Sequence, residues 1–250
     1  MKKITLFLLI GPFLILSCDD SGDGSFSLGP GEGVQAISGS TTGFAVVDDY
    51  LYTLNGTGLT VFRISSDSPT KVREITITET AETIFQYQNN LLIGTQGGML
   101  IYNIDSRSNP TFLSSVFHQT ACDPVIAKDD IAYVTIRTGL VCNTNRIDLN
   151  RLIVVDIEDV EAPVELTSLS MQNPRGLTIS GNNLYVCEGK FGLKQFDISD
   201  KTNPMIEKSY ANIPSNDVIA LGSTLIVTSD EGISQFTIRN DELELLSSFR

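Results

Sequence analysis

Five polar residues stand at matching places along the chain, each just before a strand-like apolar run. They are Thr42, Glu82, Asp123, Arg175 and Asn216. If those runs are strands around one axis, as the repeat described below predicts, the five side chains gather at one mouth of a central channel. A ring of mixed charge could hold a small polar ligand, a cation or a side chain of a protein partner. The alternative is that strand ends are polar only because they face water.

Signatures of catalysis are missing from the sequence. The one histidine, His118, would have to serve any Ser-His-Asp triad, and no nucleophile-elbow pattern accompanies it. There is no phosphate-binding Gly-Lys-Ser/Thr loop and no spaced Cys/His cluster, so we expect no cofactor and no metal. Glu82 and Asp123 with Arg175 could serve a hydrolase or lyase, which is the alternative to a binding role.

Two cysteines flank one predicted hairpin. Cys122 precedes and Cys142 follows a pair of strands that turn at Asp129-Asp130, so their ends should come together. In an exported protein this predicts a Cys122–Cys142 disulfide; two free thiols are the alternative. Cys187 lies inside a predicted strand and is expected to be a buried thiol.

A repeat of about 41 residues positions all of these side chains. An apolar strand ends in isoleucine followed by a polar turn five times, at Ile64, Ile104, Ile157, Ile198 and Ile238. Four of the turns then carry a proline. The second interval, from Ile104 to Ile157, is about 12 residues too long, which places an insertion in the third unit at about residues 138–150. A fixed period of this size indicates a repeat architecture.

Each unit contains four short runs rich in Val, Ile, Leu, Tyr and Phe, separated by Gly, Asn and Asp, which predict antiparallel strands. In the first two units the expected strands include Val72–Ile77 and Ile84–Tyr87. Four strands per unit of about 40 residues predict an all-β fold, a five-bladed β-propeller of four-stranded antiparallel blades. The blades would span about 42–80, 81–120, 121–173, 174–212 and 213–250. A β-solenoid usually has a shorter period, and a sixth blade is possible if the chain is truncated.

The repeat resembles a known family. Leu152-Ile153-Val154-Val155-Asp156-Ile157 is similar to the signature of LVIVD-repeat proteins, and 192–199 followed by Asn203-Pro204 looks like a degenerate copy. The resemblance covers residues 42–250. It implies a bacterial, propeller-like protein that is often lipid-anchored, and it implies no particular activity.

The N-terminus has the pattern of a targeting segment. Lys2-Lys3 precede an apolar run, 4–16, that is too short to span a bilayer, so we expect a signal peptide over 1–17. The ending 15–18 resembles the bacterial lipobox, which implies that Cys18 is lipidated. An ordinary signal peptide with an incidental cysteine is the alternative. Residues 18–41 are rich in Gly, Ser and acids and predict a flexible tether.

The net charge of the chain limits the classes of molecule that it could bind. The chain has 17 basic and 30 acidic residues and a formal net charge of −13, which argues against nucleic acid. We therefore expect a non-enzymatic binding scaffold, anchored through its lipid to a bacterial membrane, at the outer membrane or cell surface rather than the inner membrane. Its partner would be a protein or a small polar ligand. A purely structural or adhesive lipoprotein is a further alternative.

Overall fold

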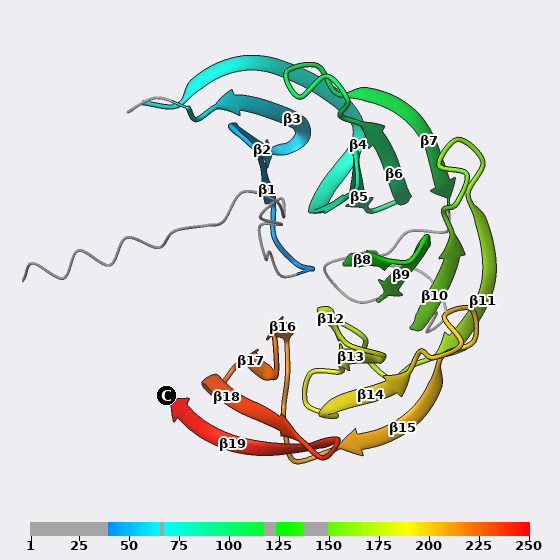
Figure 1. Ribbon diagram of the computed structural model, residues 1–250, viewed down its shortest axis with the longest axis vertical. Coiled ribbons are helices and arrows are strands. Elements are labelled where there is room, and N and C mark those ends of the chain that lie inside the picture. Colours follow the sequence, from blue (N-terminus) through cyan, green and yellow to red (C-terminus); the bar gives the residue numbers. More distant parts are fainter. Residues whose placement is uncertain (1–39, 66–67, 118–123, 138–149) are drawn as a thin grey trace, which may run out of the picture. The chain divides into compact units, whose positions relative to one another are not determined.

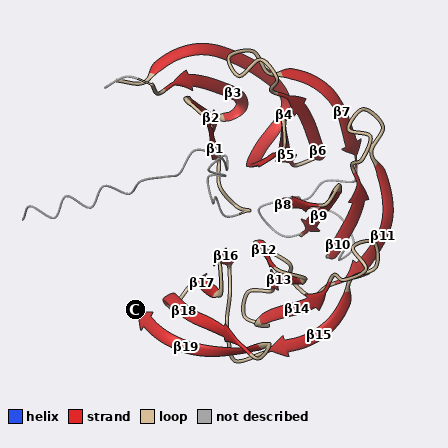
Figure 2. Cartoon of the chain, viewed as in Figure 1, coloured by secondary structure: helices blue, strands red, loops and turns tan. Residues whose placement is uncertain are grey.

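The computed structural model describes residues 40–65, 68–117, 124–137 and 150–250, all within one compact unit that spans 34–250. The fold is all-β, and no helix occurs among these residues (Figure 2). Within the described part of the chain, therefore, no helix is long and apolar enough to cross a membrane. The predicted Cys122–Cys142 disulfide and His118 lie outside the described residues.

The described residues contain nineteen strands, which form antiparallel sheets in which neighbours in sequence are neighbours in space. The first sheet has seven strands: β1 (Phe44–Val47), β2 (Tyr50–Leu54), β3 (Gly56–Arg63), β4 (Thr70–Tyr87), β5 (Asn90–Thr95), β6 (Gly98–Asn103) and β7 (Thr111–Phe117). The second has β8 (Val125–Lys128), β9 (Ile131–Ile136), β10 (Arg151–Asp156) and β11 (Val164–Ser170). The third has β12 (Leu177–Ser180), β13 (Asn183–Cys187), β14 (Leu193–Asp197) and β15 (Met205–Tyr210). The fourth has β16 (Asp217–Leu221), β17 (Thr224–Ser229), β18 (Gly232–Arg239) and β19 (Glu242–Phe249).

The four-stranded pattern holds from the third sequence unit onward, but the first two units are fused into one sheet. The strands expected at Val72–Ile77 and Ile84–Tyr87 are both parts of β4, which pairs with β3 through its first half and with β5 through its second. The expectation of two separate strands was wrong because the linking residues 78–83 contain no Gly or Pro to end the strand.

The sheets are arranged around a common centre. In Figure 1, β8, β12 and β16 lie nearest the centre, whereas β7, β11, β15 and β19 lie on the rim. The innermost strands pack in sequence order: β1 against β4, β4 against β8, β8 against β12, and β12 against β16. The start of each inner strand therefore faces the same central region.

Apolar clusters fill the space between successive units. In one of them Tyr133 of β9 packs with Leu184 of β13 and Phe196 of β14, and all three side chains are fully buried. Because side chains alternate across a strand, the neighbouring Tyr185 belongs to the next cluster, together with Leu225 of β17. The second, third and fourth units thus each contribute one face to the cluster before them and the other face to the cluster after them, so both of their faces are apolar.

The repeating isoleucine has a structural reason. The N–H of each residue donates a hydrogen bond to the turn between the first two strands of its own unit, with N···O distances of 2.7–2.9 Å. The five donors are Ile64, Ile104, Ile157, Ile198 and Ile238. The side chains of Ile104, Ile157 and Ile198 are also buried. The residue therefore closes the end of the third strand and fills the core.

A glycine opens the third strand of several units. Gly192 has φ +102°, and a β-carbon there would lie 2.3 Å from the carbonyl oxygen of Tyr210. Gly98 and Gly232 stand at the same repeat position with positive φ and an equally close carbonyl of the fourth strand. The repeat needs glycine here because another side chain would overlap the neighbouring backbone.

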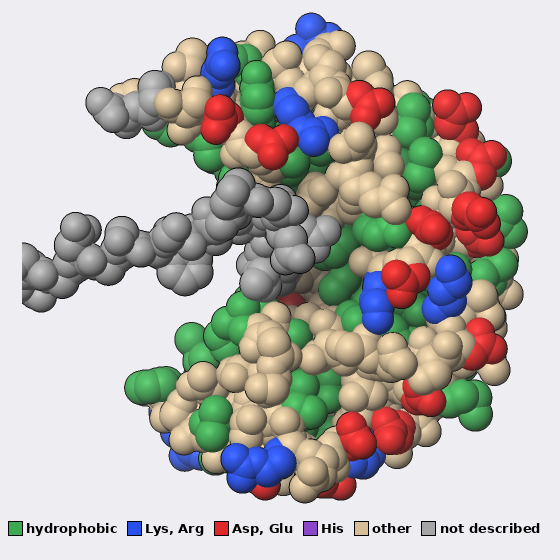
Figure 3. Space-filling view, viewed as in Figure 1, with side chains coloured by type: hydrophobic (Ala, Val, Ile, Leu, Met, Phe, Trp, Pro, Cys, Tyr) green, Lys and Arg blue, Asp and Glu red, His purple; other side chains and the backbone are tan. Residues whose placement is uncertain are grey.

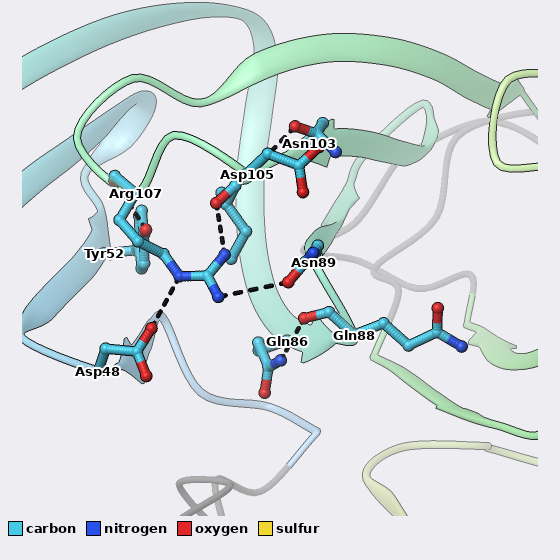
Figure 4. A network of polar contacts seen from close by, with 9 residues as sticks. Asp48, Tyr52, Gln86, Gln88, Asn89, Asn103, Asp105 and Arg107 are labelled. Atoms are coloured by element: carbon cyan, nitrogen blue, oxygen red, sulfur yellow. Dashed lines mark hydrogen bonds and ion pairs between the residues drawn. The ribbon is translucent and has the colours of Figure 1, made fainter. Parts of the chain in front are cut away.

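Polar clamps join neighbouring units on their turn side (Figure 4). Arg107, in the loop after β6, donates from Nε to Asp48 Oδ2 at 2.9 Å and from Nη2 to Asn89 Oδ1 at 3.3 Å. The hydroxyl of Tyr52 donates to the carbonyl oxygen of Arg107 at 2.8 Å. The loop of the second unit is thereby fixed against the first unit.

The same clamp recurs between the third and fourth units. The hydroxyl of Tyr133 donates to the carbonyl oxygen of Lys201 at 2.8 Å, and Lys201 Nζ donates to the carbonyl oxygen of Asp129 at 2.6 Å. Since Tyr52 and Tyr133 hold the same repeat position, the clamp is part of the repeat.

Among the described residues, one apolar face of the first unit and one of the last unit have no neighbouring sheet. Phe44 of β1 is 49% exposed and Ile233 of β18 is 48% exposed, whereas their repeat equivalents Leu177 and Leu193 are buried. No packing comparable to that between the other inner strands joins β1 to β16 among the described residues. In the space-filling view the described residues leave an opening between these two units (Figure 3).

Candidate functional site

A polar cavity of about 270 Å³ lies where the inner strands begin. Residues of the second to fifth sequence units and one residue preceding β1 line it: Thr41, Glu82, Thr83, Pro124, Arg137, Arg175, Gly176 and Asn216. The cavity therefore occupies the position expected for the mouth of a propeller channel.

Three of the five predicted site residues meet in this cavity: Glu82, Arg175 and Asn216. Thr42 does not line it; its backbone carbonyl accepts a hydrogen bond from the N–H of Ile84 at 2.9 Å, and the preceding Thr41 faces the cavity instead. Asp123 lies outside the described residues.

A break in strand register presents Glu82 to the cavity. Ala81 and Thr83 of β4 pair with consecutive residues of β5, so Glu82 is the extra residue of a β-bulge. Bulges commonly re-aim a side chain at a functional site. The amide of Gln96 donates to Glu82 Oε1 at 2.9 Å and fixes the carboxylate.

A chain of hydrogen bonds holds Arg175. Its Nη1 donates to Asn216 Oδ1 at 2.6 Å, and Asn216 Nδ2 donates in turn to Asp230 Oδ1 at 2.7 Å. Thr135 Oγ1 donates to the backbone oxygen of Arg175 at 2.6 Å. The Nε of Arg175 is buried beside Gly189 and has no hydrogen-bond partner among the described residues. The guanidinium is thus fixed while retaining unused donors.

Sequence reasoning missed Arg137, the second arginine of the cavity. It follows β9 directly and is half-buried. Burial lowers the pKa of its guanidinium; the charge of Arg175 lowers that pKa further, and Glu82 acts in the opposite sense. The three charges therefore interact across one small space.

The strand register contains the signal that would have found Arg137. Gln96, Arg137, Gly189 and Asp230 hold one repeat position, just after the second strand of their units. Gln96 and Asp230 each bond the cavity residue of their own unit, and Gly189 lies beside Arg175. A second polar column therefore lies behind the predicted one.

The residues before β1 cross to the fourth and fifth units. Ser40, which is buried, accepts a hydrogen bond on Oγ from the N–H of Leu177 at 2.7 Å. Thr41 Oγ1 donates to Asp217 Oδ2 at 2.5 Å. Burial raises the pKa of the Asp217 carboxyl, and the bond from Thr41 partly offsets this effect. The segment thus forms one wall of the cavity.

Other candidate groups lie elsewhere. Glu79 accepts a hydrogen bond from Thr95 Oγ1 at 2.7 Å and does not line the cavity. Cys187 is fully buried, as predicted, and burial raises the pKa of its thiol. The described residues contain no group of three or more His, Cys, Asp or Glu side chains that could hold a metal ion.

The cavity is more positive than the protein around it. Two guanidinium groups face one carboxylate among its lining residues, although the chain carries a net charge of −13. Such a local excess of positive charge favours an anion.

Comparison with known proteins supports this architecture. Residues 173–212 match the family model of the LVIVD repeat. None of the curated proteins compared with the chain matches it. Two examples illustrate the solved structures that are similar to it. A functionally unknown protein from Desulfotomaculum acetoxidans has a TM-score of 0.67 at 12% identity, over 82% of this chain and 68% of that one.

The second is the periplasmic gluconolactonase of Pseudomonas aeruginosa, with a TM-score of 0.63 at 12% identity, over 80% of this chain and 67% of that one. This chain thus spans about two thirds of the length of both proteins. At such low identity the likeness concerns the fold alone. The chain therefore contains an LVIVD repeat within a propeller-like, all-β fold.

Proposed function

We propose that this chain is a non-enzymatic binding protein, a five-bladed propeller whose channel mouth is its binding site. The observation that carries the proposal is the convergence of Glu82, Arg137, Arg175 and Asn216, from four different sequence units, on one cavity. A concave site with a few fixed polar groups is the usual form of a small-molecule site.

The blade count rests on the repeat. Five isoleucines make the same bond to the first turn of their own unit, and the halves of β4 complete the first unit and begin the second. The seven-stranded sheet would therefore be two blades that share one strand.

The cellular setting is proposed from the N-terminal sequence. The run 4–16 and Cys18 favour export and lipidation, and 18–41 would act as the tether to a membrane of the cell envelope, at the outer membrane or cell surface. The mouth and the insertion between β9 and β10 would then form the contact face for a ligand or a protein.

A thermal-stability screen tests the binding role. The chain would be melted with small polar molecules of each charge class, beside a Glu82→Ala/Arg175→Ala variant. At least one class should raise the melting temperature of the wild type and not of the variant, since binding to the folded state stabilises it. If no class does so, the mouth is not a small-molecule site.

Capture from intact envelopes tests the protein-partner version. The wild type would be compared with a triple variant, Glu82→Ala, Asp123→Ala and Arg175→Ala. A partner that binds through the mouth should be lost from the variant, whereas identical captured proteins would exclude the polar ring as the contact surface.

The alternative is an envelope hydrolase or lyase. It is favoured by the presence of Glu82 and Arg175 in one cavity, and by the similarity in fold to a gluconolactonase. Water addition to a lactone would give a carboxylate, which the arginines could bind. Release of acid from gluconolactone, measured by pH-stat and abolished by Glu82→Gln, would support an enzyme; a rate equal to that of the buffer would exclude lactone hydrolysis.

A further inference from the structure

We infer that the channel-mouth cavity binds a small hydroxy-carboxylate with a single negative charge. This inference rests on the proposed binding function and adds the chemical class of the ligand. It follows from the charges, the fixed donors and the size of the cavity.

The charges of the cavity call for an anion. Arg137 and Arg175 both line it, and burial together with the repulsion of Arg175 lowers the pKa of Arg137. Glu82 offsets part of that repulsion, which leaves one positive charge uncompensated among the lining side chains. A monoanion completes this balance, whereas a ligand with two or three negative charges would be repelled by Glu82.

The two arginines that line the cavity are the kind of donor that binds a carboxylate. A guanidinium presents its N–H groups as a planar fork that matches a carboxylate with two hydrogen bonds. Arg175 is fixed through Asn216 and Asp230, and its backbone is held by Thr135, so little side-chain freedom is lost when it binds an anion.

Glu82 indicates that the ligand also carries a hydroxyl group. Its Oε1 accepts a hydrogen bond from Gln96, and the carboxylate has further lone pairs that can accept from hydroxyl groups. Asn216 and Thr41 add neutral polar groups to the same lining. A volume of about 270 Å³ suits a small molecule. A hydroxylated acid would place its carboxylate on the arginines and a hydroxyl on Glu82.

Titration calorimetry with four matched six-carbon probes tests this inference. The probes are gluconate (a monoanion), glucose (neutral), glucosamine (a cation) and glucose 6-phosphate (a dianion at neutral pH). We expect gluconate to bind most tightly, by at least tenfold over each of the other three.

Substitutions locate the site. Arg137→Gln and Arg175→Gln should each weaken gluconate binding by about tenfold to a hundredfold, since each removes a charge-assisted hydrogen bond. Glu82→Gln should weaken gluconate binding and reduce the ratio of the affinity for gluconate to the affinity for glucose 6-phosphate. Arg239→Gln is the matched control: it removes the same charge from an exposed position on β18, and should change affinity less than twofold. Circular dichroism would verify that each variant is folded, and Arg175→Lys supplies a charge-preserving second variant.

The outcomes separate this inference from the proposed function. If glucose, glucosamine or the phosphate binds as tightly as gluconate and the cavity variants abolish that binding, the mouth is a site but the ligand class is wrong. If gluconate binds and the arginine variants leave its affinity unchanged, the inference is also wrong. If no probe binds, the hydroxy-carboxylate class is excluded, and binding by any other class in the stability screen then decides the proposed function separately.

Discussion

Replacing leucine by alanine at one repeat position should lower the free energy of unfolding by very different amounts in different units. Leu51, Leu184 and Leu225 occupy equivalent places in the second strands of the first, fourth and fifth units. Leu184 and Leu225 are fully buried in clusters shared with the preceding unit, whereas Leu51 faces the open side of the first unit and is only partly buried. Truncation to alanine should reveal this difference.

The magnitudes follow from burial. Leu184→Ala and Leu225→Ala each remove a fully buried side chain and leave a cavity, at a cost of about 3 kcal/mol. Leu51→Ala removes a side chain that already meets solvent and leaves no closed cavity, so the loss should be about 1 kcal/mol. Leu225 is the control for position in an end unit, because it lies on the inward face of the last unit.

Urea unfolding followed by circular dichroism measures these losses as shifts of the midpoint at constant slope. The free energy of unfolding should fall by a similar amount for Leu184→Ala and Leu225→Ala and by about a third as much for Leu51→Ala. An equal loss for all three would contradict the reasoning, since it would mean that the outer face of the first unit is covered in solution.

Three further predictions concern polar groups. Asp217→Asn should raise the melting temperature at pH 7 and make no difference below about pH 4. Burial raises the folded-state pKa of the Asp217 carboxyl, so wild-type stability falls as the pH rises from the unfolded-state pKa through the folded-state pKa. A variant whose stability depends on pH as strongly as that of the wild type would contradict this. Tyr133→Phe should cost about 1 kcal/mol in urea unfolding, because it removes the hydrogen bond to Lys201; no change in the midpoint would mean that the clamp adds nothing to stability. Lys194→Met should lower the free energy of unfolding by about 3 kcal/mol, because it leaves the fully buried Glu188 without its ion-pair partner at 2.8 Å. Adding Glu188→Gln to this variant should restore part of the lost stability. If Lys194→Met alone is as stable as the wild type, the ion pair has no structural role.

The sequence predicted most strands because each unit repeats the same hairpin signals. The turn predicted at Asp129-Asp130 joins β8 and β9, and the sequence assigned to the insertion falls between β9 and β10. The sequence did not predict that two strands join to form β4. A run of strand-forming residues without Gly or Pro can form one long strand or two strands joined by a loop, and pairing with the neighbouring strands decides which of the two forms.

The sequence also predicted some of the residues that line the cavity. Glu82, Arg175 and Asn216 were predicted to lie together because each directly precedes a strand-like apolar run, and all three are among the residues that line the cavity. Thr42 was predicted in place of Thr41 because successive side chains of an extended segment point to opposite sides, and repeat spacing alone could not tell which of the two faces the cavity. Arg137 was missed because its unit carries the insertion, so its place in the second polar column follows only from strand pairing.

The most direct test of the central claim is NMR observation of the arginine side chains during titration with gluconate. The Nε–H signals of Arg137 and Arg175 should shift on binding, while the signal of Arg239 stays in place and glucose leaves all three unchanged. Unchanged Arg137 and Arg175 signals at saturating gluconate would contradict the account, because they would show that no anion reaches the channel mouth.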